Sequence, residues 1–283
     1  MAQLMTDAWA ARRSRAADLQ GRQPFAAEIL ALYSALLPVQ EEAFVETRAR
    51  PPAAGRIAAY VAEGVFPRVA AVTVEAAPPE LRAAVANRVA EVSPQAIVAA
   101  WMFGDAQPEV DRYLARASLS PVLEALEDTA AVAFPGPRDE RHCPRCAGPP
   151  QLSYFAAPSE DLASGGRRLV CARCHAEWGY PRMTCASCGE TAGARLPIYS
   201  ETGTAAGERG GVIRGLGPQR ESDALFPHIR IEGCESCGHY LLNIDVAANS
   251  FAVPIVDELA ALPLDLYARD RGLTKITPNL VGF

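Results

Sequence analysis

Apolar side chains in the first 140 residues recur at the spacing of a helix face. The two clearest series are Phe25, Ile29, Leu32 and Leu36, and then Leu81, Val85, Val89 and Val92. Prolines, Pro38 among them, separate the apolar stretches, and Ser120 followed by Pro121 is typical of a helix N-terminus. We therefore expect about five to seven helices, packed as a bundle-like domain.

Beyond residue 140 the pattern changes to short runs that are typical of strands. The runs are QLSYF at 151–155, RRLV at 167–170, EWGYPR at 177–182, RLPIY at 195–199, HIRI at 228–231 and YLLNI at 240–244. The C-terminal stretch PIVDELAALPLDLYARDRGL is helical again, and we expect Pro263 to divide it into two short helices.

All eight cysteines lie among these runs, in four C-x-x-C pairs. The pairs are Cys143/Cys146, Cys171/Cys174, Cys185/Cys188 and Cys234/Cys237. Four thiolates complete one tetrahedral shell, which suits zinc or rubredoxin-type iron, so eight predict two metal sites. Structural disulfides are disfavoured because no secretory signal is visible at the N-terminus. Thiol–disulfide catalysis is disfavoured because no thioredoxin-like βαβ pattern accompanies the pairs.

The order of knuckles and strands favours sequential pairing of the cysteines. Knuckle, strand, strand, knuckle, strand occurs twice, so we expect the first two pairs to share one metal and the last two the other. The predicted fold class is α+β: an N-terminal all-α domain, two rubredoxin-like or zinc-ribbon-like modules and a helical tail. The expected ranges are 1–138, 139–183, 184–250 with a flexible insertion at 200–227, and 251–283.

Charge and hydropathy disfavour two classes of protein, nucleic-acid-binding proteins and membrane-spanning proteins. The formal net charge is −6, which disfavours nonspecific nucleic-acid binding. The basic clusters are expected to be solvated loops; they are Arg167 with Arg168, and Arg209 with Arg214 and Arg220. No run of 18 uncharged apolar residues is present, so no membrane span is expected. His142 and His239 are expected at the surface or behind the ligands, and His175 could donate to a thiolate.

The segments CPRC, CARCHAEWGYPRMTCASCGE, CESCGHYLLNID and VDELAALPLDLYARDRGL, in this order, resemble FdhE, the formate dehydrogenase accessory protein family. The resemblance covers about residues 140–283. It implies a cytoplasmic protein, not itself an enzyme, that binds a formate dehydrogenase catalytic subunit and is needed for an active enzyme. It also implies rubredoxin-like sites with iron or zinc, in which the eight cysteines match the family's ligands. The chain departs from the family at Ala147, Leu242, Pro263 and the long loop 200–227.

Three functional hypotheses follow. The first is a maturation factor whose two four-cysteine sites form a scaffold, because no G-x-S-x-G, P-loop or G-x-G-x-x-G motif is present. Trp178, Tyr180 and Arg182 are its expected exposed partner-binding anchors, since aromatic and arginine residues dominate interface energies. The second is a rubredoxin-like redox protein that cycles iron centres, each held by four cysteines. The third, a nucleic-acid-binding ribbon protein, is disfavoured by the acidic charge.

Overall fold

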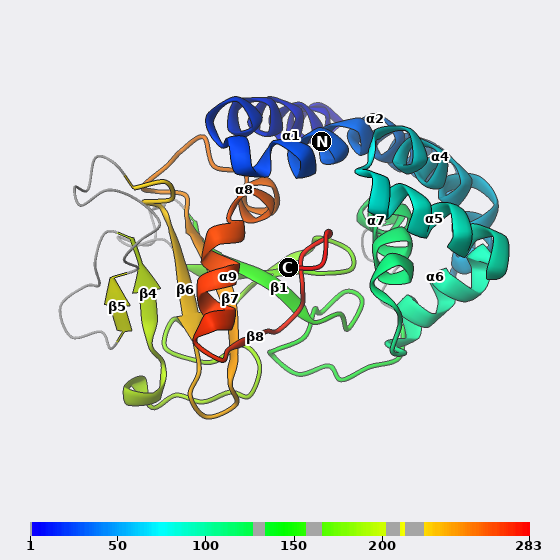
Figure 1. The fold of residues 1–283 in the computed structure, drawn as a ribbon. Helices are drawn as coiled ribbons and strands as arrows, with labels where there is room; N and C mark the ends of the chain where they lie inside the picture. The colour runs from blue at the N-terminus through cyan, green and yellow to red at the C-terminus, as the bar shows by residue number, and fades with distance from the viewer. Residues whose placement is uncertain (1, 127–133, 157–165, 202–209, 213–223) are drawn as a thin grey trace.

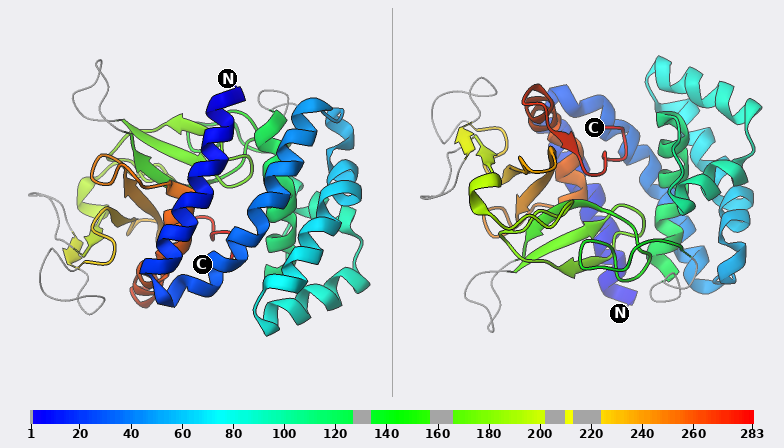
Figure 2. Two further views of the ribbon diagram at one scale, coloured as in Figure 1. Left: turned by 90° about the horizontal axis from the view of Figure 1, so that it is seen from above. Right: turned by 90° about the horizontal axis from the view of Figure 1, so that it is seen from below.

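The computed structural model describes residues 2–126, 134–156, 166–201, 210–212 and 224–283. Its fold is α+β, as the sequence predicts: helices from the first half of the chain lie beside a sheet from the second half (Figure 1). Two C-terminal helices, α8 (Pro254–Ala260) and α9 (Leu262–Asp270), pack on the sheet. Figure 2 shows the bundle to one side of the molecule and the first helix crossing over the sheet side.

Residues 2–126 form the helical part. Its helices are α1 (Ala2–Arg22), α2 (Ala27–Ala49), α3 (Ile57–Tyr60), α4 (Phe66–Ala76), α5 (Pro79–Glu91), α6 (Pro94–Phe103) and α7 (Glu109–Leu126), with a π-helical turn between α3 and α4. Leu32, Leu36 and Val85 of the predicted faces are buried. Phe25 and Val89 are 45% and 39% exposed instead. Phe25 differs because it lies in the 3-10 turn before α2, outside the regular helix.

Two prolines that were expected at helix boundaries lie inside helices. Pro38 is within α2 and Pro121 within α7, so the prediction of a helix N-terminus at Ser120 is wrong. A proline in a helix leaves the carbonyl four residues earlier without its N–H donor. For Pro121 that carbonyl belongs to Ala117, and Gln40 Nε2 of α2 donates to it at 2.9 Å. The neighbouring helix therefore replaces the hydrogen bond that the proline removes.

The strands of both cysteine-rich modules join in one sheet. The strands are β1 (Pro150–Phe155), β2 (Arg167–Cys171), β3 (Glu177–Gly179), β4 (Ile198–Ser200), β5 (Gly210–Val212), β6 (Ile229–Gly233), β7 (His239–Asp245) and β8 (Thr274–Lys275). Their order in the described chain is β3-β2-β1-β7-β6-β4-β5, with β8 on β7. The three strands β1, β2 and β3 of the first module correspond in sequence to β4, β6 and β7 of the second.

The junction between the modules is the parallel pair β1 and β7, so the two repeats are joined head to tail. Ser153 pairs with Asn243 in this register, and Asn243 Nδ2 donates to Ser153 Oγ at 2.8 Å. Both residues are fully buried. Instead of standing apart as two separate ribbons, the repeats share a continuous hydrogen-bonded sheet.

The predicted insertion at 200–227 falls mostly on residues 202–209 and 213–223, which lie outside the described residues. Between those two stretches, Gly210–Val212 forms β5, parallel to β4. Phe226, which follows them, is buried in the same apolar cluster as α1, α8 and α9.

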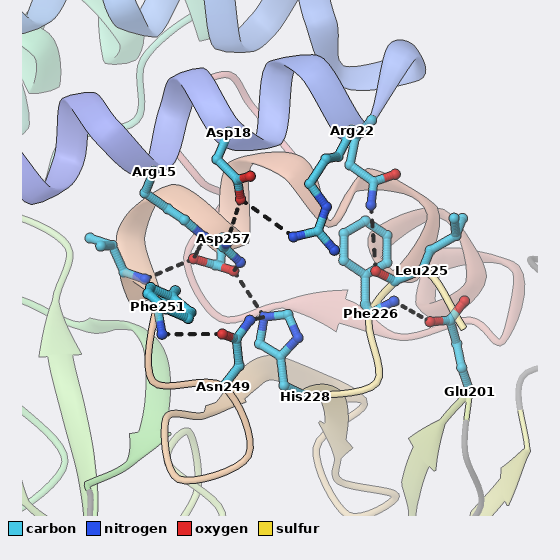
Figure 3. A network of polar contacts seen from close by, with 12 residues as sticks. Arg15, Asp18, Arg22, Glu201, Leu225, Phe226, His228, Asn249, Phe251 and Asp257 are labelled. Carbon is cyan, nitrogen blue, oxygen red and sulfur yellow. Dashed lines mark hydrogen bonds and ion pairs between the residues drawn. The ribbon is translucent and has the colours of Figure 1, made fainter. Parts of the chain in front are cut away.

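The C-terminal tail forms two helices, as Pro263 predicts, and ties α1 to the sheet. Arg15 of α1 donates from Nε to Asp257 of α8 at 2.9 Å, and His228 Nε2 lies 2.8 Å from the same carboxylate (Figure 3). All three side chains are at least nine-tenths buried. This buried ionic contact therefore fixes the position of the first helix over the sheet.

One helical stretch, Ala54–Ala76, is long and apolar enough to span a membrane by length and composition. Its 18-residue apolar window is 44% buried against the rest of the protein. Core helices of globular proteins pass the same test, so this is weak evidence for a membrane span. Val61, Val65, Phe66 and Val69 of this stretch belong to the apolar core of the bundle.

Candidate metal centres

The eight cysteine sulfurs gather in two clusters, each within 4.8 Å. Centre 1 contains Cys143, Cys146, Cys171 and Cys174, and centre 2 contains Cys185, Cys188, Cys234 and Cys237. The described S–S separations are 3.4 to 3.6 Å in centre 1 and 3.7 to 3.8 Å in centre 2. A tetrahedron with metal–sulfur bonds of about 2.3 Å has edges of about 3.8 Å, whereas a disulfide needs about 2.05 Å. The geometry therefore suits two metal sites of four cysteines each.

All four knuckles fold with the same two backbone hydrogen bonds. In the first, Cys143 N donates to Gly148 O and Cys143 O accepts from Ala147 N, each at 2.9 Å. The pairs that begin at Cys171, Cys185 and Cys234 repeat both bonds. The C-x-x-C spacing therefore produces one turn that aims both sulfurs at a common point.

The residue after each second cysteine has a left-handed backbone. Gly189 and Gly238 have φ of 81° and 71°, a conformation that glycine adopts without strain. Ala147 and His175 occupy the same place in centre 1 with φ of 53° and 54°. Non-glycine residues are strained there, so the surrounding packing of centre 1 must hold these two turns in place.

The helical part encloses centre 1. Arg145 Nη2 donates to Leu123 O at 3.1 Å, and this carbonyl lies near the C-terminal end of α7. On the other knuckle, His175 Nδ1 lies 3.2 Å from Glu124 Oε2, which also accepts from Arg12 of α1. Burial alone would raise the pKa of Glu124, but Arg12 and His175 lower it to about 2. His175 Nδ1 thus contacts a carboxylate, and among the described residues no hydrogen bond from its ring to a thiolate is present.

Arg173, between the cysteines of the second knuckle, is a further argument for metal in centre 1. Its residue is 6% exposed, and its Nε and Nη1 have no hydrogen-bond partner among the described residues. The guanidinium lies 5.9 Å from the Trp101 ring centroid and 6.0 Å from that of Phe134. A buried cation needs a compensating negative charge. A divalent ion with four thiolates carries a net charge of −2, so an occupied centre 1 would supply it.

Centre 2 lies at the surface. Cys188 is exposed and Cys237 half-buried, whereas Cys185 and Cys234 are buried. Its two knuckles are linked by a bond from Ser236 Oγ to Glu190 Oε2 of 2.6 Å. The two centres therefore share knuckle geometry but differ in their access to solvent.

Two of the three predicted partner-binding residues are not exposed, which corrects the expectation for Trp178 and Tyr180. Trp178 is 9% exposed and donates from Nε1 to Glu140 O at 2.9 Å. Tyr180 is 7% exposed and donates to Cys185 O at 3.0 Å. Trp178 belongs to the apolar core that continues into the helical part. The residue pattern of its own strand does not indicate this long-range burial. Arg182 is exposed, and its guanidinium lies 4.6 Å from the Phe155 ring centroid.

The remaining arginines and histidines named in the sequence analysis are placed as follows. Arg167 is 4% exposed and donates to Glu232 at 2.6 Å, so its interpretation as a solvated loop residue is wrong. Arg209, Arg214 and Arg220 lie outside the described residues. His142 Nδ1 lies 2.6 Å from Asp139, and His239 is half-buried. Sequence reasoning missed Glu124 and Arg173; only the position of Arg173 inside a C-x-x-C pair was a visible signal.

Comparisons with a family model and with curated proteins both match FdhE proteins. The family model described as "FdhE, C-terminal domain" matches residues 216–281. The FdhE homologue of Aquifex aeolicus is 28% identical over 173 residues, which are 61% of this chain and 52% of that protein. The homologue of Pseudomonas aeruginosa is 29% identical over 139 residues, which are 49% and 38% of the two chains. These matches span about half or less of the curated relatives.

The fold is also similar to that of a solved protein. The crystal structure of the FdhE protein from Pseudomonas aeruginosa matches with a TM-score of 0.63 and 22% identity. The match covers 98% of this chain and 95% of that one, so it includes the helical part that the family model leaves out.

Proposed function

Because these comparisons support the FdhE family of formate dehydrogenase accessory proteins, we propose that this protein is a cytoplasmic maturation factor. In this role it binds the catalytic subunit of a formate dehydrogenase and is needed for assembly of the active enzyme. The observation that carries the proposal is the pair of preformed four-cysteine clusters in the turns of one sheet, in a chain whose relatives are FdhE homologues.

The eight cysteines would hold two metal ions, iron or zinc, as the structural frame of the docking surface. Four thiolates around a divalent ion supply folding energy on the order of 10–16 kcal/mol for structural zinc. Both clusters lie in the turns that flank strands of one sheet, so metal in either one would stiffen the ends of those strands. The bound metal thus supplies a rigid surface, and the reaction itself belongs to the client enzyme.

For the docking surface we favour the exposed end of β1. Phe155 is half-buried, with Arg182 at 4.6 Å and Arg230 at 4.7 Å from its ring centroid. Met183, next to Arg182, is 49% exposed. An aromatic ring beside arginines is the composition of interface hot spots, which supports contact with a protein partner here.

The test is co-purification from cells that produce the cognate formate dehydrogenase. We expect the tagged full-length chain to recover the catalytic subunit, and cells without the gene to lose formate dehydrogenase activity. The Phe155→Ala variant should recover at least about tenfold less subunit, as for a hot-spot residue. Phe251→Ala is the matched control, because Phe251 is 81% exposed at another place. Failure of the unmodified chain to recover the subunit would refute the proposal.

A redox role is the second candidate, because Cys188 brings centre 2 to the surface where an electron-transfer partner could approach. Zinc has no redox chemistry, so metal identity separates the two functions. Metal analysis and visible absorption of protein purified without air decide the matter. Bound zinc without iron excludes redox cycling and leaves the scaffold role intact.

A further inference from the structure

The two centres differ most in the exposure of matched cysteines. Cys146 and Cys188 hold the same place, as second cysteine of the first knuckle of each centre. Cys146 is 0% exposed, and so are the other three sulfur-bearing residues of centre 1. Cys188 is exposed to solvent. The same turn is therefore closed in one centre and open in the other.

Centre 1 is closed by parts of the chain that lie far from it in sequence. Its cysteines share an apolar cluster with residues of α2, α4, α6 and α7. Trp178 of β3 belongs to the same cluster, and the Arg145–Leu123 bond holds a knuckle against α7. Because all four of its cysteines are 0% exposed within this cluster, an incoming ligand meets no exposed sulfur unless the packing around the knuckles opens.

Contacts from the cysteine-rich half of the chain hold centre 2. Arg141 Nη1 donates to Ser187 O and Tyr180 Oη donates to Cys185 O, each at 3.0 Å, and Thr274 N donates to Gly238 O at 2.9 Å. These contacts leave Cys188 exposed and Cys237 half-buried.

The two knuckles of centre 2 are linked by the Ser236–Glu190 bond, and Glu235 N donates at 2.9 Å to Arg195 O in the 3-10 turn after the third knuckle. Ser236 and Glu235 are exposed, so water competes for both bonds. These links can break while the sheet and the bundle stay intact.

We propose that centre 2 is an exchangeable site for a thiophilic divalent cation and that centre 1 is a closed structural site. The inference rests on the proposed metal binding of both centres. Exchange is a substitution of ligands without change of oxidation state. The four cysteines of centre 2 would hold the ion, and on its release donor atoms of an external chelator would replace the four thiolates, which would take up protons from water.

The protein would thus be able to gain or lose one ion while folded. Centre 2 lies at the surface, where a client or a metal-delivering protein can approach, whereas centre 1 holds the bundle on the sheet. In this proposal the metal of centre 1 stabilises the fold, and any response to metal supply occurs at centre 2.

The test follows zinc release from the full-length chain, loaded with two equivalents without air, into excess 4-(2-pyridylazo)resorcinol. We expect two phases of one equivalent each, with rates that differ at least tenfold. Iodoacetamide in the same mixture should label Cys185, Cys188, Cys234 and Cys237 in the fast phase, as read by peptide mass spectrometry. The matched variants are Cys188→Ser, which should lack the fast phase, and Cys146→Ser, which should lack the slow one.

Release of both equivalents in one phase would overturn the proposal, and so would early labelling of the centre 1 cysteines. The labelling uses the unmodified chain, so the test stands even if Cys146→Ser does not fold. No formate dehydrogenase is present in this experiment, so its outcome is independent of co-purification. A single phase with two bound zinc ions would refute unequal exchange while leaving the accessory role intact.

Discussion

Gly148 lies against the sulfur of Cys171 in centre 1. A Cβ atom at position 148 would be 2.8 Å from Cys171 Sγ and 3.2 Å from two side-chain carbons of Arg173. Real Cβ atoms do not approach so closely, so the first knuckle reaches the second only because this residue has no side chain. Gly148 follows Ala147, which has the left-handed backbone of this knuckle. In the third knuckle the residue with the left-handed backbone is itself a glycine, Gly189.

The Gly148→Ala variant should therefore weaken centre 1. The added methyl must push Cys171 Sγ aside, and overpacking of this kind costs about 1–3 kcal/mol. We expect lower zinc affinity for one of the two equivalents and a reduced urea midpoint. Gly179→Ala in β3 is the matched control, because a Cβ there meets no atom within 4 Å. Equal stability and metal content in the two variants would show that the close approach is unimportant.

Lys275 of β8 forms ion pairs with two buried carboxylates, Glu258 of α8 and Asp265 of α9. Its Nζ lies 2.8 Å from Glu258 Oε1 and 3.0 Å from Asp265 Oδ1, and all three side chains are at most 3% exposed. Lys275→Met should lower the free energy of unfolding by about 3–5 kcal/mol, because it leaves both acids buried without a cation. Urea denaturation measures the change.

The control for this variant is Arg68→Met, since Arg68 forms a surface ion pair with Glu46 at 2.7 Å. Exposed pairs contribute about 0–1 kcal/mol, so this variant should stay close to the unmodified protein. A Lys275→Met variant as stable as Arg68→Met would mean that Glu258 and Asp265 become neutral or hydrated at little cost.

Much of the candidate site could be predicted because its determinants are local. The C-x-x-C spacing and the glycines at 189 and 238 specify the knuckles, and the flanking runs at 167–170 and 240–244 became strands. The junction of β1 with β7 was not predictable, since it pairs residues about ninety positions apart, such as Ser153 and Asn243. The burial of Trp178 was missed for the same reason, because the apolar cluster that it joins includes residues from the other half of the chain.

The Asp257 carboxylate should make stability depend on pH. Burial raises its pKa, but the hydrogen bonds from His228 and Arg15 and the charge of Arg15 lower it below the usual value. A carboxylate with a lowered folded-state pKa stabilises the protein above its unfolded pKa of about 3.9. That stabilisation is lost as the pH falls through the folded-state pKa. The groups that face this carboxylate are Arg15, His228 and the Val253 N–H, with Asp18 beside Arg15 (Figure 3).

We therefore expect the free energy of unfolding to fall as the pH is lowered from about 5 toward the folded-state pKa. Asp257→Asn should be less stable at neutral pH and should show a shallower fall, because its amide does not titrate. Urea denaturation at a series of pH values, followed by circular dichroism, measures both. Parallel curves for the two proteins would place the acid sensitivity at other carboxylates.

The bond from Gln40 to Ala117 exists because Pro121 cannot donate to that carbonyl. Gln40→Leu should cost about 1–3 kcal/mol, since it leaves a buried carbonyl without a partner. In a Pro121→Ala background the new N–H of residue 121 can donate to Ala117, so the same substitution should cost clearly less. A double-mutant cycle by urea denaturation measures this coupling. Equal costs in both backgrounds would show that Gln40 stabilises α7 by packing alone, independently of the proline.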